Sequence, residues 1–338
     1  MPAPDLGHRL TDKELAKLEQ RISRVYREAW DDLEKTVIDY FNRFLERDEE
    51  MKKLVGTEIN GKVWTEQDYK LWRLNQIGRG ERFDDLAVKV AERYTKANQV
   101  AVAYVNDATP GIYSLNRNYA AYTIEKASGN VGFTLWDEQT VKRLIVKKPE
   151  LMPYYPEKKA LRRGIDLKWG KKQITKSVTS GLLQGKSVGK IATDLQARVS
   201  EMNRASAVRS ARTAITNAQN AGRMDSYKAA EKMGIEMERQ WLATLDARTR
   251  DEHAMADGQT VGIDEPFTVG GEKLMFPGDG SLGASGWNLY NCRCTQIAKV
   301  KGVDMSDTKR RARDAETGRN VVIDNMTFKE WEAWKRGN

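Results

Sequence analysis

The sequence predicts an α+β protein in which long N-terminal helices precede a smaller, glycine-rich α+β module. Apolar residues recur at three- and four-residue steps through most of residues 11–105 and again in 169–233, which is the spacing of one helix face. In residues 235–300 this period is lost, and eight glycines separate short stretches typical of strands. A helical half followed by a mixed module is therefore expected.

The first helical element is expected over residues 11–55, as one long helix or as two in line. Thr11 and Glu14 have the spacing of a capping box, in which hydroxyl and carboxylate each satisfy a backbone N–H of the other. This pair predicts a helix start at Thr11.

A second helical block is expected over 65–105, with a break near Gly78, and should pack on the first block as a hairpin. Residues 107–114, which contain Pro110, are expected to close it. The aromatic-rich stretch that follows, up to Trp136, lacks a clear period and is interpreted as turns and short helices.

Three of the chain's eight prolines, Pro149, Pro153 and Pro156, fall within eight residues and mark a boundary. The predicted organisation has four parts: a helical, partner-docking region at 1–150, a proline-rich junction at 151–165, a module at 166–300, and a basic, Trp-containing tail at 301–338.

Within the second half, a helix over 169–183 is expected to end at Gly185, and Ser187 should start a short helix. A long helix follows over 203–233, with Gly234 as its left-handed cap. Short strands are predicted in four places: 238–242, 259–263, 266–269 and 295–300.

The 338 residues include 57 Lys plus Arg against 48 Asp plus Glu, a formal net charge of +9 that favours an acidic partner. The two cysteines lie one residue apart, so no disulfide framework or oxidising compartment is implied. Because no run of about 18 apolar residues or signal-peptide core occurs, the expectation is a protein made in the cytoplasm that does not engage a membrane.

The residues with the most distinctive chemistry are His253, Cys292 and Cys294. An imidazole and two thiolates are typical zinc ligands, which predicts a structural zinc site. The gap of one residue between the cysteines is shorter than in most zinc sites, so a histidine that merely packs beside reduced thiols remains an alternative. A catalytic alternative makes His253 a general base beside Asp246 or Asp251.

Basic residues are concentrated in two segments. The helix at 203–233 combines arginines with a stripe of small residues, which favours a packed helix face with a solvated basic edge, or else an edge that contacts phosphates. The tail carries the densest basic run, followed by Phe328, Trp331 and Trp334 at the spacing of one face of a short helix. The candidate phosphate contacts are Arg204, Arg209, Arg212, Lys309, Arg310, Arg311 and Arg313.

Several spaced elements of the second half resemble one family. In order along the chain they are Ala211-Arg212-Thr213-Ala214, Asn217 to Arg223, Trp241, Asp246, Arg248, Arg250, His253, Asp257-Gly258, Phe267, Pro277-Gly278-Asp279 and Asn291-Cys292-Arg293-Cys294. This pattern is similar to the phage Mu F-type minor head protein module, over roughly residues 170–300. The tail from Lys309 to Trp331 also resembles the ends of tailed-phage minor capsid proteins.

The resemblance implies a phage head morphogenesis protein that is built into the procapsid in few copies, inside the capsid near the portal, and that assists assembly, DNA packaging or DNA delivery. The implied partners are the portal protein, capsid or scaffolding protein, and double-stranded DNA bound through phosphates without sequence preference. Two alternatives stay open: a metal-dependent nuclease or other hydrolase built on His253, Asp246 and the cysteine pair, and a scaffold that assembles through its N-terminal helices.

Overall fold

The structure is a computed structural model that describes residues 5–128, 132–148, 166–244, 246–302, 309–313 and 320–324. The chain divides into two compact units. Unit 1 comprises Met1–Glu19, Val105–Pro156 and Arg209–Asn338, and unit 2 comprises Gln20–Tyr104 and Glu157–Val208. Among the described helices, none combines the length and the apolar character needed to cross a bilayer.

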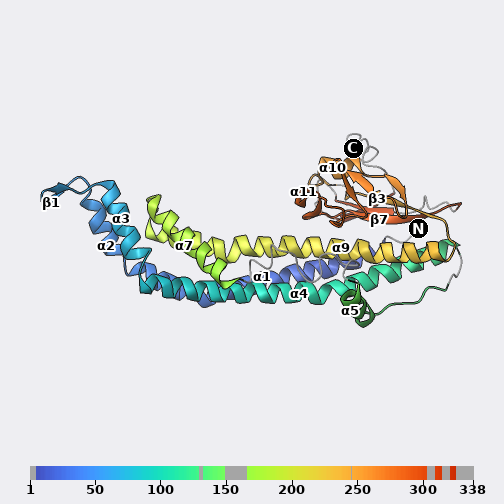
Figure 1. Cartoon of the computed structure of the whole chain (residues 1–338), viewed down its shortest axis with the longest axis horizontal. Coiled ribbons are helices and arrows are strands. Elements are labelled where there is room, and N and C mark those ends of the chain that lie inside the picture. Colours follow the sequence, from blue (N-terminus) through green and yellow to red (C-terminus); the bar gives the residue numbers. More distant parts are fainter. Residues whose placement is uncertain are drawn as a thin grey trace. The chain divides into compact units, whose positions relative to one another are not determined.

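The elements confirm the α+β class, with long helices first and a small sheet module after them (Figure 1). The helices are α1 (Leu6–Asn42), α2 (Leu45–Lys53), α3 (Glu66–Ile77), α4 (Glu81–Ser128), α5 (Glu138–Lys147), α7 (Leu167–Leu183), α8 (Val188–Gln196), the π-helix η2 (Ala197–Met202), α9 (Asn203–Lys232), α10 (Asp251–Met255) and α11 (Gly286–Leu289). The strands are β1 (Glu58–Ile59), β2 (Lys62–Val63), β3 (Met237–Leu242), β4 (Thr260–Gly262), β5 (Phe267–Val269), β6 (Glu272–Leu274), β7 (Thr295–Val300), β8 (Lys309–Arg313) and β9 (Asn320–Asp324).

In unit 2, α1 and α4 form the predicted antiparallel hairpin. Two hydrogen bonds show the antiparallel pairing, because the earlier residue of α1 contacts the later residue of α4. Tyr26 donates to Asn98 over 2.5 Å, and Asp32 accepts from Arg93 over 2.7 Å. The apolar faces of both helices join those of α7 and α8 in one core, which includes Trp30, Val37, Phe41, Val90, Val178, Leu182, Ile191 and Leu195. The apolar ladder read from the sequence is thus the packed face.

The predicted capping box at Thr11 is wrong, because α1 begins five residues earlier. Asp5 accepts a hydrogen bond from the N–H of His8 at 2.9 Å and caps the helix. Thr11 is a buried residue of the second turn, where its hydroxyl donates to the carbonyl of Gly7. A Ser or Thr inside a helix commonly makes this backward bond, which sequence spacing does not distinguish from a cap.

The predicted end of the second block at Pro110 is also wrong, since α4 continues through this proline to Ser128. Proline removes one helical N–H and so costs one hydrogen bond. Beyond it, Ile112, Tyr113, Ala121 and Ile124 are almost completely buried, and burial of these apolar surfaces outweighs the lost bond. The stretch interpreted as turns and short helices is therefore mostly the last third of α4.

The helix boundaries of the second half follow the predictions closely. The side chain of Ser187 accepts from the N–H of Lys190 and starts α8, while Gly185 after α7 and Gly234 after α9 have φ of +74° and +86°. The four predicted strands correspond to β3, β4, β5 and β7. The short strand β6 was not predicted.

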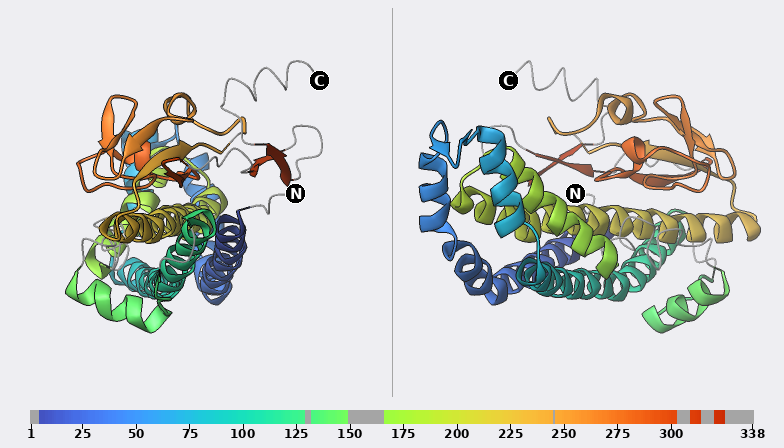
Figure 2. Two further views of the ribbon diagram at one scale, coloured as in Figure 1. Left: turned by 90° about the vertical axis from the view of Figure 1, so that its right-hand side faces the viewer. Right: turned by 60° about the vertical axis from the view of Figure 1, so that its left-hand side comes forward.

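In unit 1, α9 lies between α4 and the sheet of the module (Figures 1 and 2). The sheet has the order β4-β3-β7 and is antiparallel throughout, and β5 and β6 form a separate hairpin. Gly222 allows the close approach of α4, because a Cβ at this position would overlap the carbonyl oxygen of Tyr113. The small residues of α9 thus serve helix packing, as their pattern predicted.

The tail contributes β8 and β9, which pair antiparallel with Lys309 opposite Asp324 and Arg313 opposite Asn320. The densest basic run is therefore a strand, which was not predicted. The junction at 151–165 and the aromatic residues Phe328, Trp331 and Trp334 lie outside the described residues.

Candidate metal centre and basic residues

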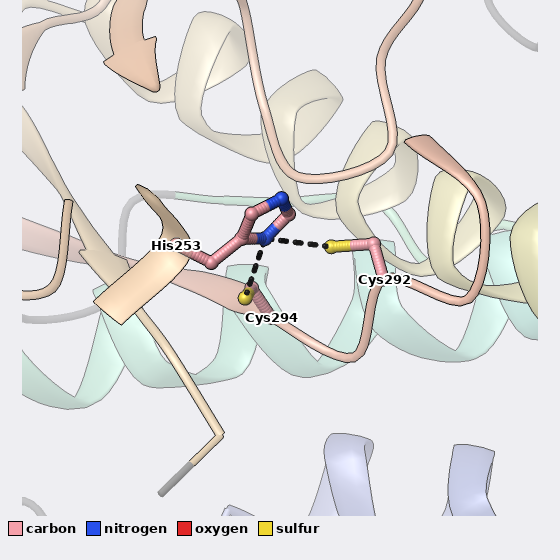
Figure 3. A group of neighbouring side chains, drawn as sticks. All are labelled: His253, Cys292 and Cys294. Carbon is pink, nitrogen blue, oxygen red and sulfur yellow. Dashed lines mark hydrogen bonds between the residues drawn. The ribbon is translucent and has the colours of Figure 1, made fainter. Parts of the chain in front are cut away.

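The structure brings His253, Cys292 and Cys294 together within unit 1 (Figure 3). The Nδ1 atom of His253, on α10, lies 3.4 Å from the sulfur of Cys294 and 3.7 Å from that of Cys292. All three residues are buried, with exposed fractions of 2%, 1% and 4%. Residues 39 and 41 positions apart in sequence thus form one cluster of metal-ligand type.

Helix α9 fixes the backbone of the two cysteines. The hydroxyl of Thr216 donates to the carbonyl of Cys292 at 2.6 Å, and the amide of Asn220 donates to the carbonyl of Cys294 at 3.2 Å. Between them, Arg293 forms a two-pronged ion pair with Asp246. Because successive residues leading into a strand point to opposite sides, both sulfurs face His253 while Arg293 faces away.

The ring of His253 is held on its other side. Trp241 packs edge-on against the imidazole at 5.7 Å between ring centres, and Arg250 Nη1 lies 3.3 Å from Nε2. A guanidinium can only donate hydrogen bonds, so Nε2 accepts and the proton of the neutral ring lies on Nδ1, directed at the sulfurs. Arg250 also donates to the carbonyl of Tyr290.

The two thiols titrate as a pair. A hydrogen bond from Cys294 lowers the pKa of Cys292 well below the ordinary value against the effect of burial, and the nearby imidazole of His253 acts in the same direction. The same bond, together with burial, raises the pKa of Cys294 well above its ordinary value. The pair thus favours the state with one shared proton and one negative charge.

The catalytic alternative placed His253 beside Asp246 or Asp251, of which Asp251 is exposed at the start of α10. Both carboxylate oxygens of Asp246 are instead engaged by Arg293. Burial would raise the pKa of Asp246, but the hydrogen bonds and charge of Arg293 lower it to about 2. Asp246 is accordingly an ionised structural anion, while the burial of His253 separates it from a macromolecular substrate.

The predicted basic residues of α9 differ in what they contact. Arg204 and Arg209 are exposed, and the guanidinium of Arg209 lies 5.7 Å from the centre of the Tyr290 ring. Arg212 makes a bidentate pair with Glu19 at 2.6 and 3.0 Å. Lys309, Arg310, Arg311 and Arg313 lie in β8.

A buried polar face of α9 was missed by the interpretation of this helix as a solvated basic edge. Thr216, Asn220, Arg223 and Tyr227 recur at helical spacing and all contact the segment 292–296. Arg223 is only 2% exposed and donates to the carbonyl of Gln296 at 3.1 Å. The helical spacing of these polar residues was the signal that could have revealed this face. It indicates a second side of α9 that packs against the protein.

Comparison with known proteins agrees with this architecture. Residues 172–297 match the model of the family described as phage Mu protein F like protein. The minor head protein GP7 of Bacillus phage SPP1 is 29% identical over 242 residues, which cover 69% of this chain and 72% of the phage protein. No solved structure matches the chain.

A second relative is an enterococcal protein named NAD(+)--arginine ADP-ribosyltransferase EFV, from Enterococcus faecalis. It is 35% identical over 130 residues, or 38% of this chain, and the match spans about a quarter (26%) of that protein's length. The family match covers the helices and strands that carry the cysteine and histidine cluster. These similarities identify residues 172–297 as a domain that resembles the phage Mu protein F like family.

Proposed function

We propose that this chain is a phage minor head protein that takes part in head morphogenesis. The observation that carries the proposal is the 242-residue match to the SPP1 minor head protein, which is nearly twice as long as the family domain. The likeness therefore extends well beyond the family domain. A match over most of both chains supports a shared role in the particle.

The test is made in a phage or prophage that encodes the chain. Purified heads should contain the chain at a few copies relative to the major capsid protein, as measured by quantitative mass spectrometry. Deleting its gene should lower the yield of infectious particles, and supplying the gene in trans should restore it. Particles that lack the chain, together with an unchanged yield after deletion, would rule out the head role.

The proposed partner of the helical half is the portal protein, at a site inside the capsid. The candidate contacts are Leu45 of α2, Val63 of β2 and Leu71 of α3, because each is an exposed apolar side chain of unit 2. Co-expression with the portal protein of the same phage should yield a complex that Val63→Asp with Leu71→Asp weakens at least tenfold. Leu135→Asp, at an exposed apolar residue of unit 1, is the matched control.

The proposed contact with double-stranded DNA is through phosphates and uses Arg204 and Arg209, with β8 as a second basic segment. Arg212 should contribute less because Glu19 already neutralises it. The double variant Arg204→Gln with Arg209→Gln should lose about two phosphate contacts. The slope of log K against log salt concentration should therefore become less steep by roughly 2. Arg47→Gln, at an exposed arginine of α2, should leave the slope unchanged.

We further propose that the chain works by binding and assembly without catalytic turnover. The transferase activity in the name of the enterococcal relative is not carried over, because the match covers only about a quarter (26%) of that protein. Incubation of the full chain with NAD and an arginine-containing substrate, and separately with DNA and divalent metal, should give no product. Product that disappears in the His253→Asn variant would support the hydrolase or transferase alternative.

A further inference from the structure

We propose that His253, Cys292 and Cys294 bind one zinc ion that ties α10 to the segment leading into β7. This role is structural and does not depend on the proposed head function. The protein supplies three ligands, Nδ1 of the imidazole and the two sulfurs, which is one fewer than most structural zinc sites have.

The nitrogen and sulfur atoms of the cluster are separated by distances that suit zinc. With a Zn–S distance of about 2.3 Å and a Zn–N distance of about 2.0 Å, a tetrahedral arrangement places the nitrogen and each sulfur roughly 3.5 Å apart. The observed separations of 3.4 and 3.7 Å between Nδ1 and the two sulfurs bracket this value. The cluster can therefore accept zinc with only small side-chain movements.

The cluster is held in place by the protein without a metal. The carbonyls of Cys292 and Cys294 are anchored to Thr216 and Asn220 of α9, so the backbone between the two sulfurs is fixed. Arg293, the residue between them, is turned to Asp246. Both sulfurs consequently face the imidazole. The gap of one residue between the cysteines, which is short for a zinc site, therefore does not prevent them from binding the same ion.

The burial of the cluster and the charge of its thiolates also favour a zinc ion. The cluster lies against the apolar core of the module, which includes Trp241, Phe267, Leu274 and Leu289. A buried thiolate requires a compensating positive charge. One Zn²⁺ neutralises two thiolates, and soft sulfur ligands with an imidazole suit zinc better than the hard cations Mg²⁺ or Ca²⁺.

Arg250 provides a way to separate the zinc site from a simple hydrogen-bonded cluster. When Nδ1 binds a metal, Nε2 carries the proton, and the guanidinium 3.3 Å away cannot accept it. Zinc binding thus requires Arg250 to turn away from His253. Arg250→Gln supplies a carbonyl oxygen that accepts the Nε2 proton, so this variant should bind zinc more tightly than the wild type.

The experiment uses the full chain, purified under reducing conditions and equilibrated with zinc, then passed into metal-free buffer. Mass spectrometry should find one zinc per chain in the wild type, and none in Cys292→Ser with Cys294→Ser or in His253→Asn. His8→Asn is the matched control because His8 is the other histidine of the chain, and it should retain zinc. Titration of the metal-free wild type with Co²⁺ should produce an intense thiolate-to-cobalt absorption band.

If a variant does not fold, the measurements on the wild type are sufficient to refute the proposal. A folded wild type that retains no zinc and gives no cobalt–thiolate band would overturn it. An Arg250→Gln variant that binds zinc more weakly than the wild type would also overturn the proposal. That result is expected if Arg250 holds the three side chains as a hydrogen-bonded cluster without metal. A rise in affinity of about tenfold or more in Arg250→Gln, with zinc bound by the wild type, supports it.

Discussion

Arg223 on α9 forms a two-pronged ion pair with Asp5, the residue that caps α1, with both N–O distances at 2.8 Å. The guanidinium also donates to Asn116 of α4 and to the carbonyl of Gln296 in β7. A single buried side chain therefore joins the start of α1 to three other elements of unit 1. Burial would raise the pKa of Asp5, but the charge and hydrogen bond of Arg223, together with the contributions of His8, hold the pKa below the ordinary value.

This pair should make the protein less stable in acid. A carboxyl group whose pKa is lower in the folded than in the unfolded chain stabilises fully above the unfolded value of about 4 and loses this contribution as the pH falls through the folded value. Asp5→Asn should cost about 2–3 kcal/mol of unfolding free energy at pH 7, because it leaves Arg223 buried without a counter-charge. The difference from the wild type should shrink below pH 4, as measured by urea denaturation.

The control for this prediction is Glu19→Gln, which breaks a pair with Arg212 that is partly exposed on both sides. Such a pair is worth less than about 1 kcal/mol. An Asp5→Asn variant with the same loss of stability at pH 3 as at pH 7 would contradict the assignment.

Gly222 should tolerate no side chain. A methyl group there would overlap the main-chain oxygen of Tyr113, which cannot move without shifting α4. Gly222→Ala should therefore destabilise the protein by about 1–3 kcal/mol, despite the better helix propensity of alanine. Gly189→Ala in α8 is the matched control, because a Cβ there meets open space, and it should raise the thermal midpoint slightly. Equal effects of the two substitutions would refute the close contact of α4 and α9.

The helices and the central strands could be predicted from sequence because they depend on periodicity and on local caps, as at Ser187 and Gly234. The errors at Thr11 and Pro110 share one cause. Both residues carry strong local signals for a helix boundary, and in both cases a tertiary contact continues the helix: the ion pair of Asp5 with Arg223 before Thr11, and the burial of apolar residues such as Ile112 after Pro110. Local signals do not report this tertiary contribution.

The site was predictable in its residue types but not in its geometry. His253, Cys292 and Cys294 could be identified as metal ligands by chemistry, whereas their approach to 3.4 and 3.7 Å depends on anchors in α9. Those anchors, Thr216 and Asn220, have no metal-ligand chemistry and could be found only from the packing of the module on α9.

The side chain of Arg239 should stabilise the loops of the module that surround it. It is completely buried and donates to the carbonyls of Met275, Gly262 and Glu265. Burial lowers its pKa to about 10, which leaves it cationic at pH 7. Arg239→Met leaves these carbonyls without their donor and should cost about 3 kcal/mol. Arg248→Met, at an exposed arginine, should change the urea midpoint little; comparable losses in both variants would show that Arg239 does not hold the loops.

Asn220 offers a prediction in which stability changes with pH in the opposite direction. Its amide nitrogen donates to the carbonyls of Thr216, Pro277 and Cys294, while its oxygen accepts from the N–H of Gln296. Asn220→Asp keeps the shape but places a carboxylate among three carbonyl oxygens, which should cost about 3 kcal/mol at pH 7.

Burial and these oxygens would raise the pKa of the new carboxyl above its unfolded value. The Asn220→Asp variant should consequently lose stability as the pH rises above about 4, whereas the contribution of the Asp5 pair in the wild type is already complete in that range and falls only at lower pH. Asn75→Asp, at an exposed residue beside Arg79, should behave like the wild type at both pH values. Urea denaturation at pH 4 and pH 7 decides the matter: a variant no less stable at pH 7 than at pH 4 would mean that the amide of Asn220 does not hold the module on α9.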